Sequence, residues 1–533
     1  MAERGGQMNE IVLYDTTLRD GGQTEGISFS VEDKVKIARR LEEMEIPYIE
    51  GGWPAPQNRT DTQFFLRMAK EPLKKSKLVA FGSTRRAEVS VEEDPNLASL
   101  LEVSPSAVAL VGKTWDLHVR EALKTSPETN LAMISESIAF CKEKGIEVIF
   151  DAEHFFDGWS ANKEFALECL RAAEKAGADL ICLCDTNGGS LPEEIRAGVK
   201  AAQKAVKSRL GIHVHNDGGL AVANSLAAVA AGVRQVQGTI NGYGERCGNA
   251  DLCAVAANLQ LKMGFHCLPS ASLARLYEIS HYVAEIANMT PFERQPFVGR
   301  SAFAHKAGYH LDAVLKRPET YESIPPESVG NQRRLLISDQ AGGAVVVYKA
   351  RGLDIDLTKR SPQTEQILER LKEMEHEGYQ FEGAEASFEL LLRESMGLHR
   401  PKFELDSYRV LAEKRRDGRV LAEAVLRVIV DGEEQYMAAE GDGPVHALDN
   451  ALRKALERFY PGLKEVKLTD FKVRVVNVAA GTAAKVRVLV ESSDRKDSWS
   501  TVGVHENIIE ASWQALSDGM EYGLLRQEMN QEE

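Results

Sequence analysis

The chain has 533 residues, 43% hydrophobic and 27% charged, an ordinary composition for a globular protein that excludes a disordered or collagen-like chain. At roughly 150 residues per domain, the length predicts three or four domains. The 65 basic and 80 acidic residues give a net charge of −15, so general affinity for nucleic acid or an acidic membrane surface is not expected, although a local basic pocket for an anion is compatible with it. No stretch approaches the roughly 20 continuous apolar residues of a membrane-spanning helix.

The first residues and the cysteines indicate a cytoplasmic protein. MAERGGQMNE has neither the apolar core nor the cleavage site of a secretory signal. Seven cysteines lie between Cys141 and Cys267, an odd and clustered set that is a poor disulfide framework and fits a reducing compartment. Cys182 and Cys184 stand two residues apart in the apolar run DLICLCD, so we expect buried strand thiols rather than metal ligands.

Strand-like and helix-like segments alternate from residue 10 to about 265. Eight short apolar or β-branched runs are expected to be strands: 11–14, 47–51, 78–82, 107–112, 146–151, 180–184, 211–215 and 233–240. Between them lie amphipathic segments such as VEDKVKIARRLEEM, which follows Ser30 as N-cap with Asp33 three positions on, and LPEEIRAGVKAAQKAV, with proline in its first turn. Eight repeats favour an α/β fold with a closed (β/α)₈ TIM barrel at 1–285. An open doubly wound sheet is the alternative, but no Gly-rich dinucleotide loop follows the first strand.

Two further regions follow the predicted barrel. Residues 286–385 contain the turn-rich segments PFERQPF, KRPETYESIPPES and ISDQAGG and a charged helix, EQILERLKEMEHEG, which predicts connecting subdomains. Residues 386–533 contain an internal repeat of two ββα units, whose first strands are expected to begin at Val425 and Val486. Each unit leaves a sheet face that needs cover, which favours packing against the other unit or a second chain. Binding or assembly and a purely structural role are both open.

Chemically active side chains gather where the predicted strands end. They are Arg19, Asp20, Glu50, Asp151, Glu153, Asp185, Thr186, His213, His215 and the segment GYGERCGNAD. Because barrel enzymes place function at the C-terminal ends of their strands, this distribution favours an enzyme. The role of Asp151 is open between pointing into the helical layer and binding a water, since a carboxylate is awkward beside an anionic substrate.

His213 and His215 lie two residues apart on one strand, so both side chains face the barrel interior. Two imidazoles with one carboxylate and an amide oxygen suit an open catalytic site for Zn²⁺, Mn²⁺ or Mg²⁺. Two core histidines are the alternative for the pair alone. Its proximity to Asp20 and Arg19 at the same barrel end favours the metal site.

Several motifs carry a family resemblance along nearly the whole chain. YDTTLRDGGQ, HVHND and GYGERCGNAD resemble the metal-dependent acyltransferase and lyase barrels, a group that includes 2-isopropylmalate, homocitrate and citramalate synthases and hydroxymethylglutaryl-CoA lyase. AFAHKAGYHLDAV and TYESIPPESVGN are similar to the synthases' connecting subdomains, and GDGPVHA and TVGVHENIIEASWQAL to their C-terminal regulatory domain. TEGISFSVEDK, YIEGGWP and ENIIEASWQALSDGMEYGLL look most like the citramalate synthase branch.

The resemblance implies roles for individual residues. The metal ligands it implies are Asp20, His213, His215 and Asn249. Arg19 would face the substrate ketone oxygen, where charge grows, and Thr186 would hydrogen-bond the substrate carboxylate. Pairing of Arg19 with a structural carboxylate, and helix capping by Thr186 or Asn249, are the alternatives.

The resemblance also implies a second half of the site. Glu153 would lie near the acetyl group of acetyl-CoA, whose methyl group must lose a proton. His310, Asp312 and Tyr321 would reach the barrel of the partner subunit of a homodimer, and the proton-accepting group is not assigned. A surface pair of His310 with Asp312 and a turn position for Tyr321 are the alternatives, and Lys306 is either a CoA contact or a solvated charge.

The expected reaction is a Claisen-type condensation of acetyl-CoA with pyruvate, followed by thioester hydrolysis to citramalate and CoA, in isoleucine biosynthesis. Another 2-oxo acid, as in 2-isopropylmalate or homocitrate synthases, a hydroxyacyl-CoA lyase and a non-catalytic metal or amino-acid sensor are the alternatives. The resemblance implies feedback inhibition by isoleucine at the C-terminal domain, where helix starts at 441–444 and 503–507 could accept a carboxylate.

Overall fold

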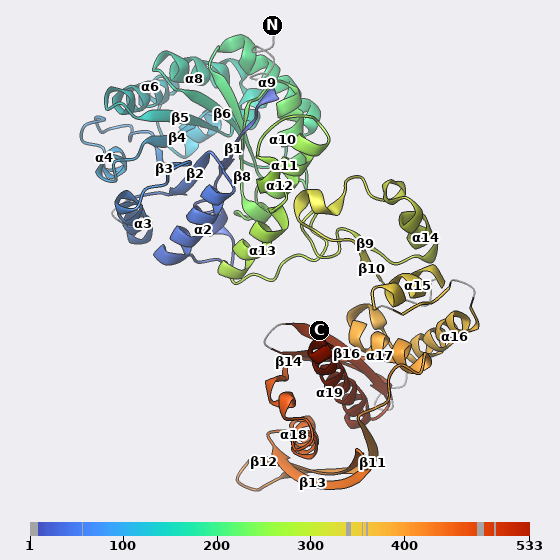
Figure 1. Ribbon diagram of the computed structural model, residues 1–533. Helices are drawn as coiled ribbons and strands as arrows, with labels where there is room; N and C mark the ends of the chain where they lie inside the picture. Colours follow the sequence, from blue (N-terminus) through green and yellow to red (C-terminus); the bar gives the residue numbers. More distant parts are fainter. Residues whose placement is uncertain are drawn as a thin grey trace. The chain divides into compact units, whose positions relative to one another are not determined.

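The computed structural model describes residues 9–55, 57–336, 343–353, 355–358, 361–476, 484–494 and 497–532. The chain forms two compact units. The first runs to Phe303 and also contains Ser323–Arg333, and the second contains Ala304–Glu322 and the chain from Arg334 onward. Figure 1 shows both units and labels most of their helices and strands.

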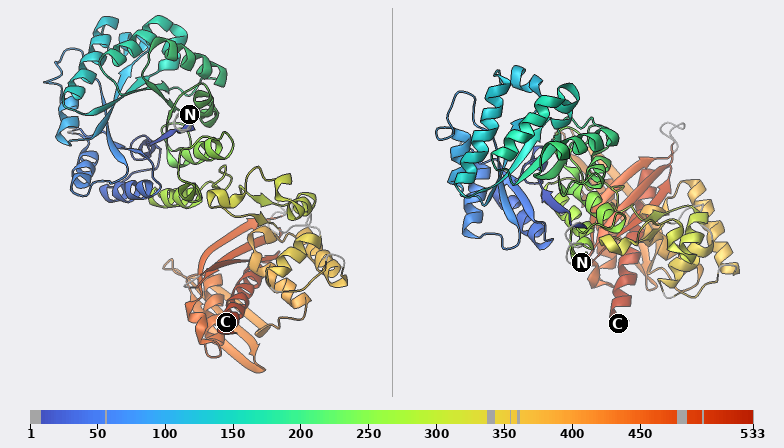
Figure 2. Two further views of the ribbon diagram at one scale, coloured as in Figure 1. Left: turned by 45° about the horizontal axis from the view of Figure 1, so that its top comes forward. Right: turned by 90° about the horizontal axis from the view of Figure 1, so that it is seen from above.

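The first unit contains the predicted TIM barrel, a closed ring of eight strands with helices outside it. The left view of Figure 2 shows this ring open toward the reader. All neighbouring strands pair in parallel. The strands are β1 (Val12–Asp15), β2 (Tyr48–Gly52), β3 (Lys77–Ser83), β4 (Ala107–Lys113), β5 (Glu147–Glu153), β6 (Leu180–Asp185), β7 (Arg209–Val214) and β8 (Gln235–Gly238). Every predicted strand is present. The largest difference is at the eighth, which is four residues long rather than eight.

Helices follow the strands and cover the barrel. They are α2 (Val31–Glu43), α3 (Arg59–Lys70), α4 (Pro95–Glu102), α5 (Asp116–Glu121), α6 (Pro127–Glu143), α7 (Phe155–Ala161), α8 (Lys163–Lys175), α9 (Pro192–Ala205), α10 (Ala221–Ala230), α11 (Leu252–Leu261), α12 (Ser270–Leu273) and α13 (Leu276–Ile286), with short 3₁₀ turns η2 (Gly21–Gln23), η3 (Ile240–Gly242) and η5 (Pro326–Val329). The predicted starts hold: Ser30 and Asp33 form a reciprocal capping box, and Pro192 opens α9.

Successive side chains along each barrel strand point alternately toward the helices and toward the barrel interior. Each strand therefore contributes to two separate cores, and this alternation decides which polar side chains face the interior. On β5, Val148 and Phe150 pack into the large cluster between barrel and helices. Ile149 instead joins a smaller cluster inside the barrel, together with Cys182 and Cys184. Because side chains two apart share a face, Asp151 and Glu153 also face the interior. The alternative that places Asp151 in the helical layer is therefore wrong.

The second unit begins with small elements. They are β9 (Ala304–His305), α14 (Gly308–Lys316), η4 (Pro318–Thr320), β10 (Arg334–Leu335), α15 (Gly343–Arg351), α16 (Pro362–Glu377), η6 (Phe381–Gly383) and α17 (Glu385–Ser395). Helix α16 is the predicted charged helix. Part of the segment ISDQAGG lies outside the described residues.

The C-terminal repeat has one more strand per unit than predicted. The first unit contains β11 (Phe403–Lys414), β12 (Val420–Val430), β13 (Glu433–Gly441) and α18 (Pro444–Leu456). After η7 (Pro461–Glu465), the second contains β14 (Lys467–Val475), β15 (Val486–Ser493), β16 (Ser498–His505) and α19 (Ile508–Glu532). Each sheet is antiparallel with the extra strand at one edge, so the units are βββα. The sequence analysis missed strands β11 and β14. Most of their side chains are exposed, including apolar ones such as Leu411 and Val473, so burial does not follow the apolar pattern in these edge strands.

All seven cysteines carry free thiols, and only Cys247 is exposed. Cys182 and Cys184 are buried on β6 as predicted. Among the described residues, the helices include none with the length and apolar character needed to cross a membrane.

Candidate active site

A cavity of about 550 Å³ opens at the C-terminal ends of the barrel strands. Six of the residues predicted to bind metal or substrate or to act in catalysis line it: Arg19, Asp20, Glu153, Thr186, His213 and His215. Asp151 and Cys184 line it too. The barrel fold thus brings together residues nearly 200 positions apart in the chain.

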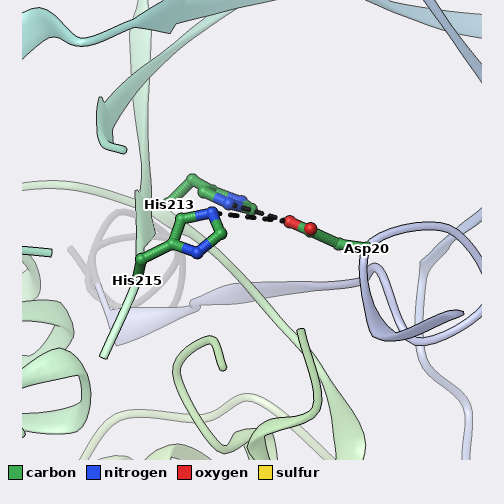
Figure 3. A group of neighbouring side chains, drawn as sticks. All are labelled: Asp20, His213 and His215. Carbon is green, nitrogen blue, oxygen red and sulfur yellow. Dashed lines mark ion pairs between the residues drawn. The ribbon is translucent and has the colours of Figure 1, made fainter. Parts of the chain in front are cut away.

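Three of these side chains converge on one point, as Figure 3 shows. Asp20 follows β1, His213 lies in β7 and His215 directly follows β7. The Nε2 atoms of His213 and His215 lie 3.2 Å and 3.8 Å from Oδ2 of Asp20. All three side chains are buried, and their potential ligand atoms lie within 4.8 Å of one another. A divalent ion can be held by such a group with small side-chain rotations.

Asn249 completes the group. A bridge pairs its backbone with that of His215. Its Nδ2 donates to Oδ2 of Asp20 at 2.8 Å and lies 3.2 Å from Nε2 of His213, while its buried Oδ1 has no hydrogen-bond partner. A carboxamide turned by 180° would direct that oxygen at the same point. The donor set fits a hard or borderline divalent ion, because it offers two imidazole nitrogens, a carboxylate and an unsatisfied amide oxygen.

The charges of the group also suit a cation. Burial opposes ionisation of Asp20, but Arg19 and His213 outweigh it and hold the pKa of this carboxyl well below its usual range. Burial and the neighbouring His213 lower the pKa of His215 to about 4. Asp20 is therefore an anion and His215 a neutral imidazole at neutral pH, the forms in which both bind metals.

Gln237 on β8 links His213 to Asp151, a contact that the sequence analysis did not predict. Its Oε1 lies 3.0 Å from Nδ1 of His213, and its Nε2 donates to Oδ1 of Asp151 at 3.1 Å. The amide oxygen can accept a proton on Nδ1 of His213, the tautomer in which Nε2 is free to bind an ion. Burial and the nearby Glu50 raise the pKa of Asp151 to about 7. In the sequence, only the position of Gln237 as a polar residue on the inward face of a short strand could have indicated a role for it.

Arg19 is fixed by a buried carboxylate. Its Nε donates to Oε1 of Glu50 at 2.5 Å, and the Tyr14 hydroxyl donates to Oε2 of Glu50 at 2.6 Å. The guanidinium carbon lies 4.0 Å from the centre of the Phe81 ring, and NH1 is 3.5 Å from Asp20. The structural pairing considered from the sequence exists, and it orients the guanidinium toward the cavity that Arg19 lines.

Thr186 and Glu153 lie on the same rim. The Thr186 hydroxyl accepts a hydrogen bond from the backbone N–H of His154 at 2.9 Å, and helix α9 begins after Leu191, so Thr186 does not cap it. Glu153 forms an ion pair with Lys113, which also lines the cavity. His154 has a left-handed backbone with φ of 58°, and its Nδ1 lies 2.9 Å from Asp157. The sequence analysis named neither Lys113 nor His154.

His310, Asp312 and Tyr321 belong to the second unit. The rings of His310 and Tyr321 stack with centroids 4.1 Å apart. Asp312 pairs with Lys316 one turn along α14, at 2.5 Å. The structure thus brings His310 and Tyr321 together, and their action on a partner's barrel stays a prediction.

Three family models together span most of the chain. Residues 10–283 match the HMGL-like model, residues 297–379 the homocitrate synthase post-HMGL domain-like model and residues 382–524 the LeuA allosteric (dimerisation) domain. With the site at the barrel mouth, these matches define an enzyme of the HMGL-like barrel class that carries a LeuA-type C-terminal domain.

Relatives of nearly equal length narrow the class. The (R)-citramalate synthase of Aquifex aeolicus is 53% identical, covering 97% of this chain and 98% of the relative. That of Geobacter sulfurreducens is 52% identical, covering 98% and 99%. A probable 2-isopropylmalate synthase of Methanopyrus kandleri is 32% identical, covering 96% and 98%. The chain belongs to the (R)-citramalate synthase family.

Proposed function

We propose that this enzyme condenses acetyl-CoA with pyruvate and hydrolyses the resulting thioester to (R)-citramalate and CoA. The observation that carries the proposal is the convergence of Asp20, His213 and His215 beside Arg19, in a chain similar over its whole length to (R)-citramalate synthases. The unsatisfied amide oxygen of Asn249 supports its place as a fourth ligand.

A bound Mg²⁺, Mn²⁺ or Zn²⁺ would supply Lewis-acid polarisation of the 2-oxo acid. Asp20, His213, His215 and Asn249 would hold that ion. The Arg19 guanidinium, immobilised by Glu50, stabilises the negative charge that develops on the ketone oxygen when the carbon nucleophile adds.

The remaining wall of the cavity suits a small 2-oxo acid. The Thr186 hydroxyl, already an acceptor for the His154 N–H, has its proton free to donate to the substrate carboxylate. Phe81 and Val111 offer apolar surface for a methyl group in the same cavity.

The acetyl-CoA half of the reaction needs a base and groups that hold an enolate. Glu153 lies on the cavity rim and is the barrel's own candidate. His310, Asp312 and Tyr321 are proposed to reach the site of the partner in a homodimer, an arrangement supported by the match to a dimerisation domain. His310 stacked on Tyr321 would present both polar groups together.

We propose three functional regions, a catalytic barrel at 1–285, connecting subdomains at 286–385 and a regulatory, dimer-forming domain at 386–533, in a cytoplasmic enzyme of isoleucine biosynthesis. The domain matched as allosteric supports isoleucine as a feedback inhibitor there. Removing the residues beyond about 390 should abolish inhibition by isoleucine, and undiminished inhibition of the truncated enzyme would refute this role.

The substrate is tested by CoA release from acetyl-CoA with a panel of 2-oxo acids, followed with a thiol reagent. Pyruvate should give the highest kcat/KM. A higher value for 3-methyl-2-oxobutanoate or 2-oxoglutarate would instead assign the enzyme to the 2-isopropylmalate or homocitrate synthases, as the relative from Methanopyrus kandleri allows. Cleavage of citramalyl-CoA to acetyl-CoA and pyruvate without net synthesis would indicate a lyase. Removal of the divalent ion with a chelator should abolish CoA release.

A further inference from the structure

A second group of potential metal ligands lies inside the barrel. Asp151 on β5 and Cys182 and Cys184 on β6 are all buried, and a carboxylate oxygen and the two sulfur atoms lie within 4.8 Å of one another. The strand register fixes this arrangement, because Asp151 pairs with Cys182 across the two strands. The two cysteines share the interior face, since they are two residues apart on one strand.

The spacing fits one ion. In a tetrahedral zinc site with metal–sulfur bonds of about 2.3 Å and metal–oxygen bonds of about 2.1 Å, ligand atoms lie roughly 3.5–4 Å apart. Small rotations of the cysteine side chains therefore bring the three atoms to bonding distance. Cys182 and Cys184 are buried strand thiols as predicted. The further expectation that they are not metal ligands did not consider the carboxylate of Asp151 on the neighbouring strand.

An ion can reach this group from the active-site cavity. Asp151 and Cys184 both line the cavity, whereas Cys182 is fully buried. The group is distinct from Asp20, His213 and His215 because it shares no residue with them and offers sulfur, which they lack.

We propose that Asp151, Cys182 and Cys184 form a second cation site, selective for thiophilic divalent ions such as Zn²⁺, Cd²⁺ and Co²⁺ over Mg²⁺. On binding, each thiol gives its proton to solvent, two metal–sulfur bonds and one metal–oxygen bond form, and no electron is transferred. The site is independent of the substrate assignment.

The proposed site is coupled to the catalytic ligands through Gln237. This amide contacts Asp151 with one end and His213 with the other. An ion that binds the Asp151 carboxylate competes for the group that anchors Gln237, and it also occupies part of the cavity. Thiophilic ions should therefore inhibit the Mg²⁺-supported reaction.

The test is a titration of reduced, metal-free, full-length protein with Co²⁺. Sulfur ligation gives an intense thiolate-to-cobalt charge-transfer band in the near ultraviolet, which the sulfur-free site cannot give. The wild type should show this band and bind two Co²⁺ per chain by equilibrium dialysis. Cys184→Ser and Cys182→Ala should lose the band and bind one. Cys247→Ser, which removes the exposed thiol, and Cys141→Ser, which removes a buried helical thiol, should behave as the wild type.

Absence of the band in the wild type, or its persistence in Cys184→Ser, would overturn the proposal. The wild type is sufficient for the first outcome even where a buried variant does not fold. A second measurement is inhibition of Mg²⁺-supported CoA release by Cd²⁺. Cys184→Ser should need at least tenfold more Cd²⁺ than wild type for half-inhibition, whereas equal sensitivity would contradict a functional link between the two sites.

Discussion

Replacing Gln237 with methionine should weaken binding of a divalent ion at Asp20, His213 and His215. Gln237 is fully buried and satisfies two partners, the Nδ1 proton of His213 and the Asp151 carboxyl. Methionine has a similar length and fills the same space, but its thioether has no donor and is only a weak hydrogen-bond acceptor. The variant thus tests the hydrogen bonds of Gln237 with little change in packing.

The expected loss of affinity is about 10- to 100-fold, the usual effect of removing a group that orients a metal-binding histidine. This corresponds to about 1.4–2.8 kcal/mol, since each tenfold change is about 1.4 kcal/mol. The range agrees with the cost of about 1–3 kcal/mol for leaving a buried donor without a partner. Without Gln237, the described residues offer Nδ1 of His213 no other side-chain partner that would favour the tautomer with Nε2 free for the ion.

The assay is a Mn²⁺ titration of metal-free protein, in which electron paramagnetic resonance measures the free ion. Gln235→Met is the matched control, because Gln235 lies two residues earlier on β8, is 2% exposed and has an unpartnered Oε1. It should bind Mn²⁺ as tightly as the wild type. Gln237→Glu keeps an acceptor for His213 but faces Asp151 with a second carboxylate, so an intermediate affinity is expected. A folded Gln237→Met protein with wild-type affinity would refute the reasoning.

Three further predictions concern other parts of the molecule. Arg19→Lys should lower kcat by about 10²–10³-fold and leave the Mn²⁺ affinity nearly unchanged. The reason is that one lysine ammonium cannot bind Glu50 and stabilise the ketone oxygen at the same time. A kcat within tenfold of the wild-type value would contradict this prediction. Phe150→Ala, which empties a fully buried site between barrel and helices, should cost about 3–5 kcal/mol of unfolding free energy in urea denaturation. Burial raises the pKa of Asp518 to about 7, so the folded protein binds the carboxyl proton more tightly than the unfolded chain does. The free energy of unfolding therefore falls as the pH rises from about 4 to about 7. Between pH 5 and pH 8, Asp518→Asn should remove at most about 3 kcal/mol of that pH dependence, because only the part of the titration from pH 5 to about 7 falls in this range. The measurement is hydrogen-exchange protection of α19 at the two pH values, and an unchanged dependence would exclude Asp518 as its source.

The barrel was predictable because its pattern is local. Each strand reads as a short apolar run bounded by helix signals, and Ser30 and Pro192 mark helix starts that the structure confirms. The parallel order then places all strand ends together, so a His-x-His pair at one of them already implied a shared site with Asp20. The ends of the elements were less certain, and β8 is half as long as expected.

The contacts that sequence reasoning missed depend on tertiary packing. Strands β11 and β14 are edge strands with mostly exposed side chains, and only pairing with β12 and β15 identifies them. The direction of Asp151 follows from the register of the whole ring rather than from its neighbours in sequence. Gln237 carries no motif, and its function becomes visible only when His213 and Asp151 are placed on either side of it.

The buried charges explain why a cation and an anionic substrate suit the same cavity. Arg19 is shared between Glu50 and Asp20, so the three groups carry one net negative charge before any ligand binds. A divalent ion reverses the sign of this group of charges, which favours binding of the carboxylate of a 2-oxo acid beside it. Asp151 does not oppose this attraction as strongly as a free carboxylate would, because burial raises its pKa to about 7 and keeps a large share of it neutral at neutral pH. The Asp151 carboxyl is therefore compatible with an anionic substrate in the same cavity. Its hydrogen bond with Gln237 also helps to position the side chains of the metal site.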